Sequence, residues 1–62
     1  MTGSKIYTAH VNKEERWWIV RVDGVGVTQA KNLREAQLMA RDLVEAMTGN
    51  PSSHFDVVIR AE

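Results

Sequence analysis

Two histidines, eight carboxylates and two adjacent tryptophans are the side chains of this chain that could carry chemistry. Metal-dependent nucleases need several carboxylates that converge on divalent cations. Asp23 and Asp56 fall at or within expected strands, but no third carboxylate is placed to converge on them. His10 and His54 lie far apart, and neither has an evident acid that would orient it as a general base. We therefore expect no catalytic residues, no metal site and no cofactor, and we expect that the protein is not an enzyme.

The length and composition favour a single small domain that binds a protein partner. Its 62 residues, 1–62, allow only a small core, and domains of this size usually need disulfides, a metal or oligomerisation. The chain has no cysteine, so disulfides and thiolate metal sites are excluded. Eight basic residues balance eight acidic ones, so direct DNA binding is not expected. No apolar run approaches membrane-spanning length, and we expect a cytoplasmic protein with no membrane partner.

The N-terminal half of the sequence predicts three strands. Alternating polarity predicts the first strand over residues 5–12, and the polar residues 13–16 then predict a turn. Residues 17–22 give the strongest strand signal, because nearly all of them are aromatic or β-branched. An Asp-Gly turn follows, and residues 25–30 predict a third, shorter strand.

The C-terminal half predicts one helix and one strand. Asn32 and Glu35 have capping-box spacing, so we expect a helix from residue 33 to residue 47 or 48, ended by Gly49. Its apolar residues recur at three- and four-residue steps and form one stripe: Leu33, Ala36, Ala40, Leu43, Val44 and Met47. Residues 55–60 predict the fourth strand.

The order strand, strand, strand, helix, strand predicts an α+β fold. Two hairpins make the first three strands antiparallel, and a right-handed crossover brings the fourth strand back beside the first. The expected architecture is therefore a four-stranded mixed sheet of order 3-2-1-4 with one helix packed on one face. The other face is left open, and we expect function to lie there.

Strand alternation places Trp17 and Trp18 on opposite faces of this sheet. The face beneath the helix is expected to carry the apolar set Tyr7, Ala9, Val11, Trp18, Val20, Val22, Phe55, Val57 and Ile59. The open face then carries Asp56 and the candidate partner-binding residues Ile6, Thr8, His10, Trp17, Ile19, Arg21, Val58 and Arg60. Four of these are large and apolar, and we expect them to form one patch that marks a protein interface. In the alternative interpretation, Arg21 and Arg60 lie over Trp17 and shield it from solvent.

Several segments, in order along the chain, are similar to the N-terminal domain of HicB-family antitoxins. They are Tyr7-Thr8-Ala9, Trp17-Trp18-Ile19-Val20, Gly24-Val25-Gly26-Val27-Thr28-Gln29-Ala30, Leu33-Arg34-Glu35-Ala36, Met39-Ala40-Arg41-Asp42 and Phe55-Asp56-Val57. The resemblance implies a partly formed RNase H-like fold and direct binding to a small mRNA-cleaving HicA-type toxin, which the antitoxin neutralises. Residues 22–26 lack the Pro-x-Leu-Pro-Gly stretch of many members, and the C-terminal DNA-binding segment of full-length antitoxins is not found, so operator binding is not implied.

Two alternatives remain open at the level of sequence. The chain could be an orphan HicB-like domain that associates only with itself, and in either case we expect a homodimer. It could also bind RNA through Trp17 of the open sheet face, whose ring would stack on an RNA base. Net neutrality disfavours RNA, whereas the acids Glu14 and Glu15 could meet the basic surface of an RNA-binding toxin.

Overall fold

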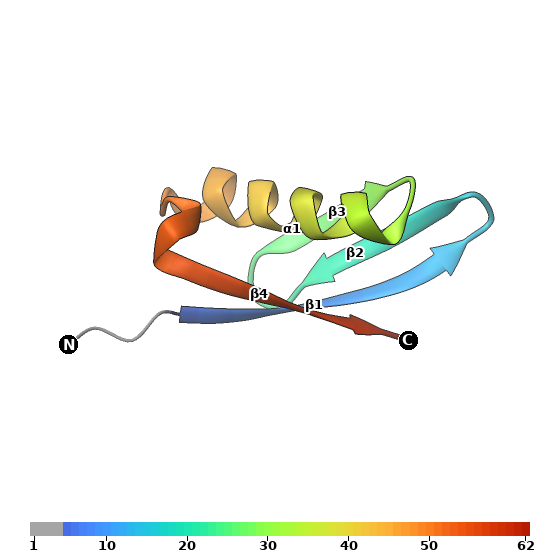
Figure 1. Ribbon diagram of the computed structural model, residues 1–62, viewed down its shortest axis with the longest axis horizontal. Helices are drawn as coiled ribbons and strands as arrows, with labels where there is room; N and C mark the ends of the chain where they lie inside the picture. Colours follow the sequence, from blue (N-terminus) through green and yellow to red (C-terminus); the bar gives the residue numbers. More distant parts are fainter. Residues whose placement is uncertain (1–4) are drawn as a thin grey trace.

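The computed structural model describes residues 5–62, and its elements follow the predicted order (Figure 1). They are β1 (Lys5–Glu14), β2 (Trp17–Val22), β3 (Gly26–Ala30), α1 (Leu33–Thr48), the short helix η1 (Ser52–His54) and β4 (Phe55–Ala61). The strands form one sheet of order β3-β2-β1-β4, in which β1 pairs antiparallel with β2 and parallel with β4. The predicted α+β architecture of one helix on a four-stranded mixed sheet is confirmed.

The first hairpin is longer and its turn tighter than the sequence predicts. β1 continues to Glu14, and the turn consists of Glu15 and Arg16 alone. Glu15 has a φ of 55°, a left-handed conformation that costs a non-glycine residue about 1 kcal/mol. Lys13 belongs to the strand, and its Nζ lies 5.6 Å from the centre of the Trp18 ring. Polar composition predicts where a turn occurs but not its length, which strand pairing sets. β3 begins and β4 ends one residue later than predicted.

Local capping sets both ends of α1, and the predicted bounds of the helix are confirmed. Asn32 Oδ1 accepts a hydrogen bond from the N–H of Glu35 at 2.8 Å. The Glu35 carboxylate accepts from the N–H of Lys31 at 3.0 Å, one residue before the position that a capping box would use. At the other end Gly49, with a φ of 78°, donates its N–H to the carbonyl of Glu45 at 2.9 Å. Neither helix of residues 5–62 has the length and apolarity needed to cross a membrane.

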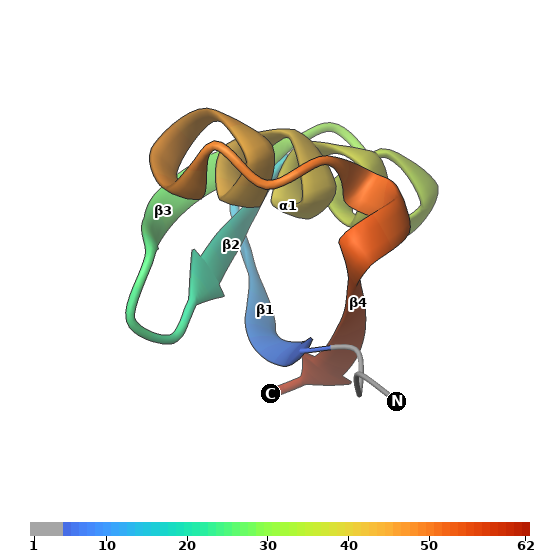
Figure 2. The same ribbon diagram turned by 90° about the vertical axis from the view of Figure 1, so that its left-hand side faces the viewer.

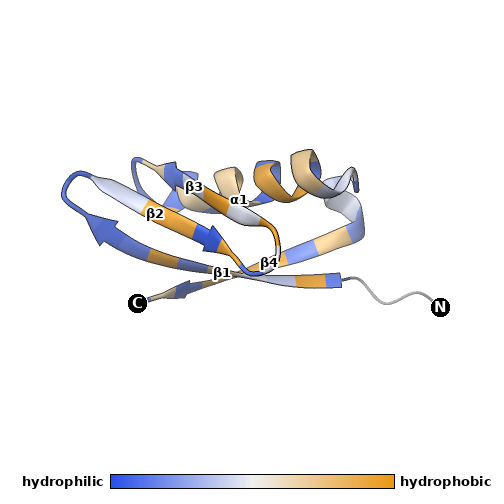
Figure 3. Ribbon diagram, turned by 180° about the vertical axis from the view of Figure 1, so that it is seen from behind, coloured by the Kyte–Doolittle hydropathy of each residue, from blue (hydrophilic) through white to orange (hydrophobic). Residues whose placement is uncertain are grey.

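The fold has two layers, with α1 on one face of the sheet and no described element on the other (Figure 2). The core between the layers consists of Tyr7, Ala9, Val11, Val20, Val22, Ala30, Ala36, Ala40, Val44, Phe55 and Val57. Trp18 and Ile59 are partly buried against it. The predicted assignment of the covered face is therefore confirmed. Hydropathy along the strands does not alternate strictly (Figure 3), because the uncovered face also carries apolar residues such as Ile6 and Val58.

The apolar stripe of α1 is shorter than predicted. Its fully buried residues are Ala36, Ala40 and Val44. Leu33 and Met47, at the two ends of the helix, are 46% and 63% exposed. A helix of this length spans about 24 Å, longer than the about 17 Å of its five-residue neighbour β3, so it extends past this strand. Leu43 and Met39 pack at the margin of the core instead, and Met39 was not part of the predicted stripe.

Candidate functional site on the open face of the sheet

The sheet face opposite α1, hereafter the open face, carries all the candidate partner-binding residues. They are Ile6, Thr8, His10, Trp17, Ile19, Arg21, Val58 and Arg60. Strand register arranges them in rows across the sheet, and the central row holds His10 between Arg21 of β2 and Arg60 of β4. Thr8 lies beside Val58 in the next row.

The large apolar residues form two groups on the open face, so the single patch predicted from sequence is wrong. Ile6 and Val58 are 63% and 47% exposed and lie diagonally across β1 and β4. Trp17, which is 36% exposed, lies with the half-buried Ile19 at the hairpin end of β2. Trp17 pairs with Glu14, and the eight residue-to-residue steps from Ile6 to Glu14 span about 27 Å of strand. We call these the Ile6–Val58 group and the Trp17–Ile19 group.

A cluster of charged side chains separates the two groups. His10 Nδ1 lies 2.7 Å from a carboxylate oxygen of Glu62, and Nε2 lies 2.9 Å from a carboxylate oxygen of Asp23. Arg21 Nη2 lies 3.8 Å from the other oxygen of Glu62. The hydrogen bond to Asp23 raises the pKa of His10 above its usual 6.5, partial burial opposes the rise, and Glu62 adds to it. The geometry suits an imidazolium that donates both of its N–H groups.

The expectation that His10 lacks an orienting acid is therefore wrong. Asp23 is held near it because its N–H donates to the carbonyl of Thr8 at 3.0 Å. Glu62 is held because its N–H donates to the carbonyl of Val11 at 2.8 Å. Sequence spacing did not reveal these acids, since the β1–β2 register decides that Asp23 reaches His10 and the β1–β4 register decides that Glu62 does. With both nitrogens engaged, this imidazole has no lone pair free to accept a proton, as a general base requires.

The acids around His10 do not converge on a common point. Asp23 and Glu62 contact opposite nitrogens of the imidazole, so the ring lies between the two carboxylates. Asp56 lies in the row of Ile6, away from this cluster. Within residues 5–62, no group of three or more histidine, cysteine, aspartate or glutamate side chains could hold a metal ion.

The arginines of the open face do not cover Trp17, so the shielding interpretation is wrong. Arg21 lies four residues along β2 from Trp17, about 13 Å away. Arg60 lies on β4, which β1 separates from β2. Both arginines belong to the central row with His10.

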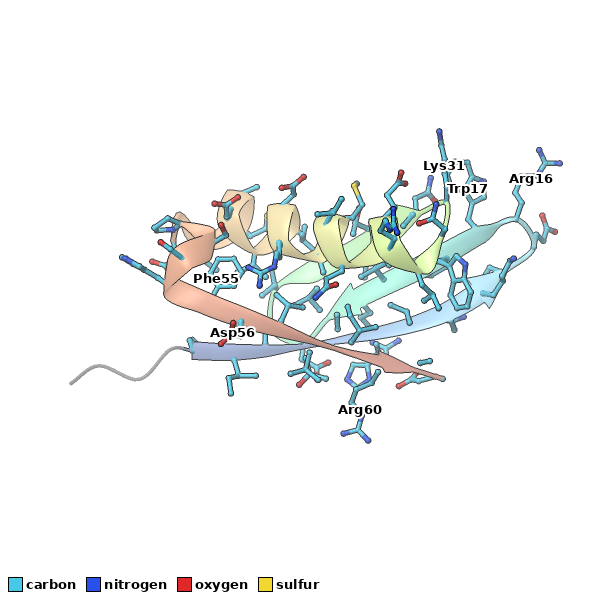
Figure 4. The ribbon with its side chains drawn as sticks, in the orientation of Figure 1. Arg16, Trp17, Lys31, Phe55, Asp56 and Arg60 are labelled. Atoms are coloured by element: carbon cyan, nitrogen blue, oxygen red, sulfur yellow. The ribbon has the colours of Figure 1, made fainter. Side chains whose placement is uncertain are left out.

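Other charged residues surround Trp17 at the hairpin end. Arg16 precedes it in the turn, and Lys31 follows the last β3 residue, which pairs with Trp18. Figure 4 places Arg16, Trp17 and Lys31 at the same end of the molecule. On its other side, Trp17 pairs with Glu14, whose carboxylate accepts a bond from Asn12 at 3.3 Å. Sequence spacing did not reveal Lys31, because its place beside Trp17 depends on the β2–β3 register.

Comparison of the chain with protein-family models, with curated proteins and with solved structures finds no match.

Proposed function

We propose that this chain is a non-catalytic protein-binding domain, similar to a HicB antitoxin domain, that neutralises a small mRNA-cleaving HicA-type toxin by direct binding. The observation that carries the proposal is the open face of the sheet. Within residues 5–62, α1 covers one face of the sheet, and the other face exposes the large side chains of Ile6, Trp17 and Val58. Exposed apolar groups rimmed by polar residues are typical of protein interfaces.

The charges beside the apolar groups favour a basic partner. Exposed Asp56 pairs with Ile6 at one end of the open face, and exposed Glu14 pairs with Trp17 at the other. A toxin that binds mRNA needs a basic surface. Acids on the domain would pair with that surface and make it inaccessible to RNA.

The proposed action is occlusion, which needs no chemistry from the antitoxin. His10 is already engaged by Asp23 and Glu62, so a role in holding the open face rigid suits it better than catalysis. The resemblance to HicB domains is the reason for proposing a HicA-type toxin as the partner. Because such a toxin cleaves mRNA, we propose that the domain acts in the cytoplasm.

Capture of the partner from lysate of the source organism tests the proposal. The baits are the unmodified domain, Trp17→Ser and Leu38→Ser. Leu38 is a matched control because it is 59% exposed but lies on α1, on the other side of the molecule. We expect the unmodified and Leu38→Ser baits to capture a small basic ribonuclease and Trp17→Ser to lose it. Capture that is equal with all three baits, or that yields no ribonuclease, would contradict the proposal.

A second candidate function is binding of single-stranded RNA at the hairpin end. Arg16 and Lys31 flank Trp17, and stacking platforms combine an aromatic ring with positive charge. Glu14 and Glu15 weaken that charge, so we rank RNA second. Titration with single-stranded RNA distinguishes the two functions: RNA binding requires quenching of fluorescence that salt reverses and that Trp17→Ser abolishes.

A further inference from the structure

β4 forms one edge of the sheet, and nothing in residues 5–62 pairs with its outer side. We propose that two copies of this chain form a homodimer in which β4 pairs antiparallel with β4 of the second copy, about a two-fold axis at Val58. The two sheets would then join into one. This contact joins sheet edges rather than open faces, although Asp56, Val58 and Arg60 at the β4 side of the open face take part in it. It goes beyond the proposed function and does not rest on it.

The main chain of β4 has unpaired groups that face outward. Glu62 donates its N–H inward to Val11 of β1, and parallel pairing alternates direction from one residue to the next. The N–H and C=O groups of the odd-numbered residues therefore point away from the sheet: Phe55, Val57, Ile59 and Ala61. An edge of seven residues that contains no proline is open to another strand.

Only one register pairs the whole strand with its own copy. In that register Phe55 lies opposite Ala61 of the second copy, and Val57 lies opposite Ile59 of the second copy. Residues with outward-facing main-chain groups then meet each other and form the hydrogen-bonded pairs of an antiparallel ladder. Val58 lies opposite its own equivalent, in the class of pair where side chains approach most closely.

The same register brings opposite charges together. Asp56 lies opposite Arg60 of the second copy, and the two-fold axis repeats the pair. Both side chains are exposed, neither forms a salt bridge within residues 5–62, and Arg60 points away from the helix (Figure 4). Opposite charges directly across an antiparallel pair are stabilising. A shift of two residues would place Asp56 opposite either Val58 or Glu62, which loses the pair or makes it repulsive.

Apolar contacts support the same arrangement. Val58 is 47% exposed and would be covered by its equivalent at the two-fold axis. Ile59, only partly buried by its own chain, would gain Val57 of the second copy as a neighbour on the helix side of the sheet. The other edge strand, β3, has five residues and no charged side chain, so self-pairing there offers no such match.

Disulfide crosslinking tests the two-fold axis directly, because the chain has no natural cysteine. We expect Val58→Cys to form a disulfide-linked dimer rapidly under mild oxidation. Val27→Cys is the matched control, since Val27 is 61% exposed and lies on the edge strand β3. Equal crosslinking rates at the two sites would mean random collision and would overturn the proposal.

A charge exchange tests the register by sedimentation equilibrium. Asp56→Lys and Arg60→Glu should each weaken the dimer at least about tenfold, because each makes two attractive pairs repulsive. The double variant should restore the dimer, since Lys at 56 would face Glu at 60. Asp42→Lys, an equal charge change on the exposed side of α1, should have no effect. A monomer at millimolar concentration for the unmodified chain, or a double variant weaker than either single variant, would overturn the proposal.

Discussion

His10 is the side chain at which three segments of the chain meet. It lies on β1, its Nε2 contacts Asp23 in the turn after β2, and its Nδ1 contacts Glu62 directly after β4. Arg21 and Arg60 flank it on the neighbouring strands. A protonated His10 therefore links β1 to the turn after β2 and to the residue after β4 by side-chain hydrogen bonds, in addition to the main-chain hydrogen bonds of the sheet.

The stability of the protein should fall as pH rises above the neutral range. The folded-state pKa of His10 is raised above the value of about 6.5 expected in the unfolded chain. Its contribution is therefore complete below about pH 6.5 and is lost as pH rises through the folded-state pKa. Arg21 and Arg60 stay charged throughout, so they do not change this sign. We expect the free energy of unfolding by urea to be smaller at about pH 9 than at about pH 6.

His10→Gln should remove most of that pH dependence, because glutamine does not titrate. His54→Gln is the control, since His54 is exposed at the end of η1 and should leave the dependence intact. If His10→Gln and the unmodified protein lose stability in parallel between these pH values, the proposed role of the cluster is incorrect.

The adjacent tryptophans should respond differently to truncation. Trp18 packs against the core beneath α1, so Trp18→Ala should destabilise the fold by about 2 kcal/mol or more. Trp17 lies on the open face, so Trp17→Ala should cost about 1 kcal/mol or less. Urea unfolding followed by far-ultraviolet circular dichroism measures both losses. Equal losses, or a larger loss for Trp17, would contradict the assignment of faces.

At the scale of elements, local signals were sufficient for the helix and for β2, but not for the length of β1. The bounds of α1 follow from groups within a few residues of each end, Asn32 and Glu35 at the start and Gly49 at the stop. The length of β1 depends instead on its partner, because Lys13 and Glu14 become strand only by pairing with β2. Polar residues alone predicted a turn there.

The N-terminal cap of α1 should contribute measurably to stability. Asn32→Ala removes the acceptor for the Glu35 N–H and should cost about 1 kcal/mol. Asn32→Gly should reduce stability by only about 0.3 kcal/mol, because glycine leaves the end of the helix open to water. Thermal unfolding of the two variants gives the comparison. Identical stability of Asn32→Ala and the unmodified protein would show that the cap bond does not operate in solution.

At the scale of the whole molecule, chain handedness predicted the sheet order but not the alignment of its strands. The right-handed crossover places β4 beside β1, whereas the long connection through α1 leaves their relative shift undetermined. That shift decides that Glu62 reaches His10 and that Ile6 and Val58 are neighbours. For this reason the sequence predicted which residues share the open face, but not that a charged cluster divides its apolar residues into two groups.

Two surfaces follow from this arrangement, and they share Asp56, Val58 and Arg60 at the β4 side of the open face. The open face is the proposed binding surface for a toxin, and the outer edge of β4 is the proposed contact between two copies of the chain. A dimer joined through β4 would present both open faces on one side of a continuous sheet. Two toxin molecules could then bind one dimer.

Inhibition of mRNA cleavage by a HicA-type toxin of the source organism tests the central claim most directly. The cleavage rate is measured as the concentration of the domain rises, for the unmodified domain, Trp17→Ser and Leu38→Ser. We expect stoichiometric inhibition by the unmodified domain and by Leu38→Ser, and an inhibition constant at least about tenfold weaker for Trp17→Ser. A toxin that stays fully active in excess domain would contradict the proposed function, and equal inhibition by Trp17→Ser would contradict the assignment of the open face.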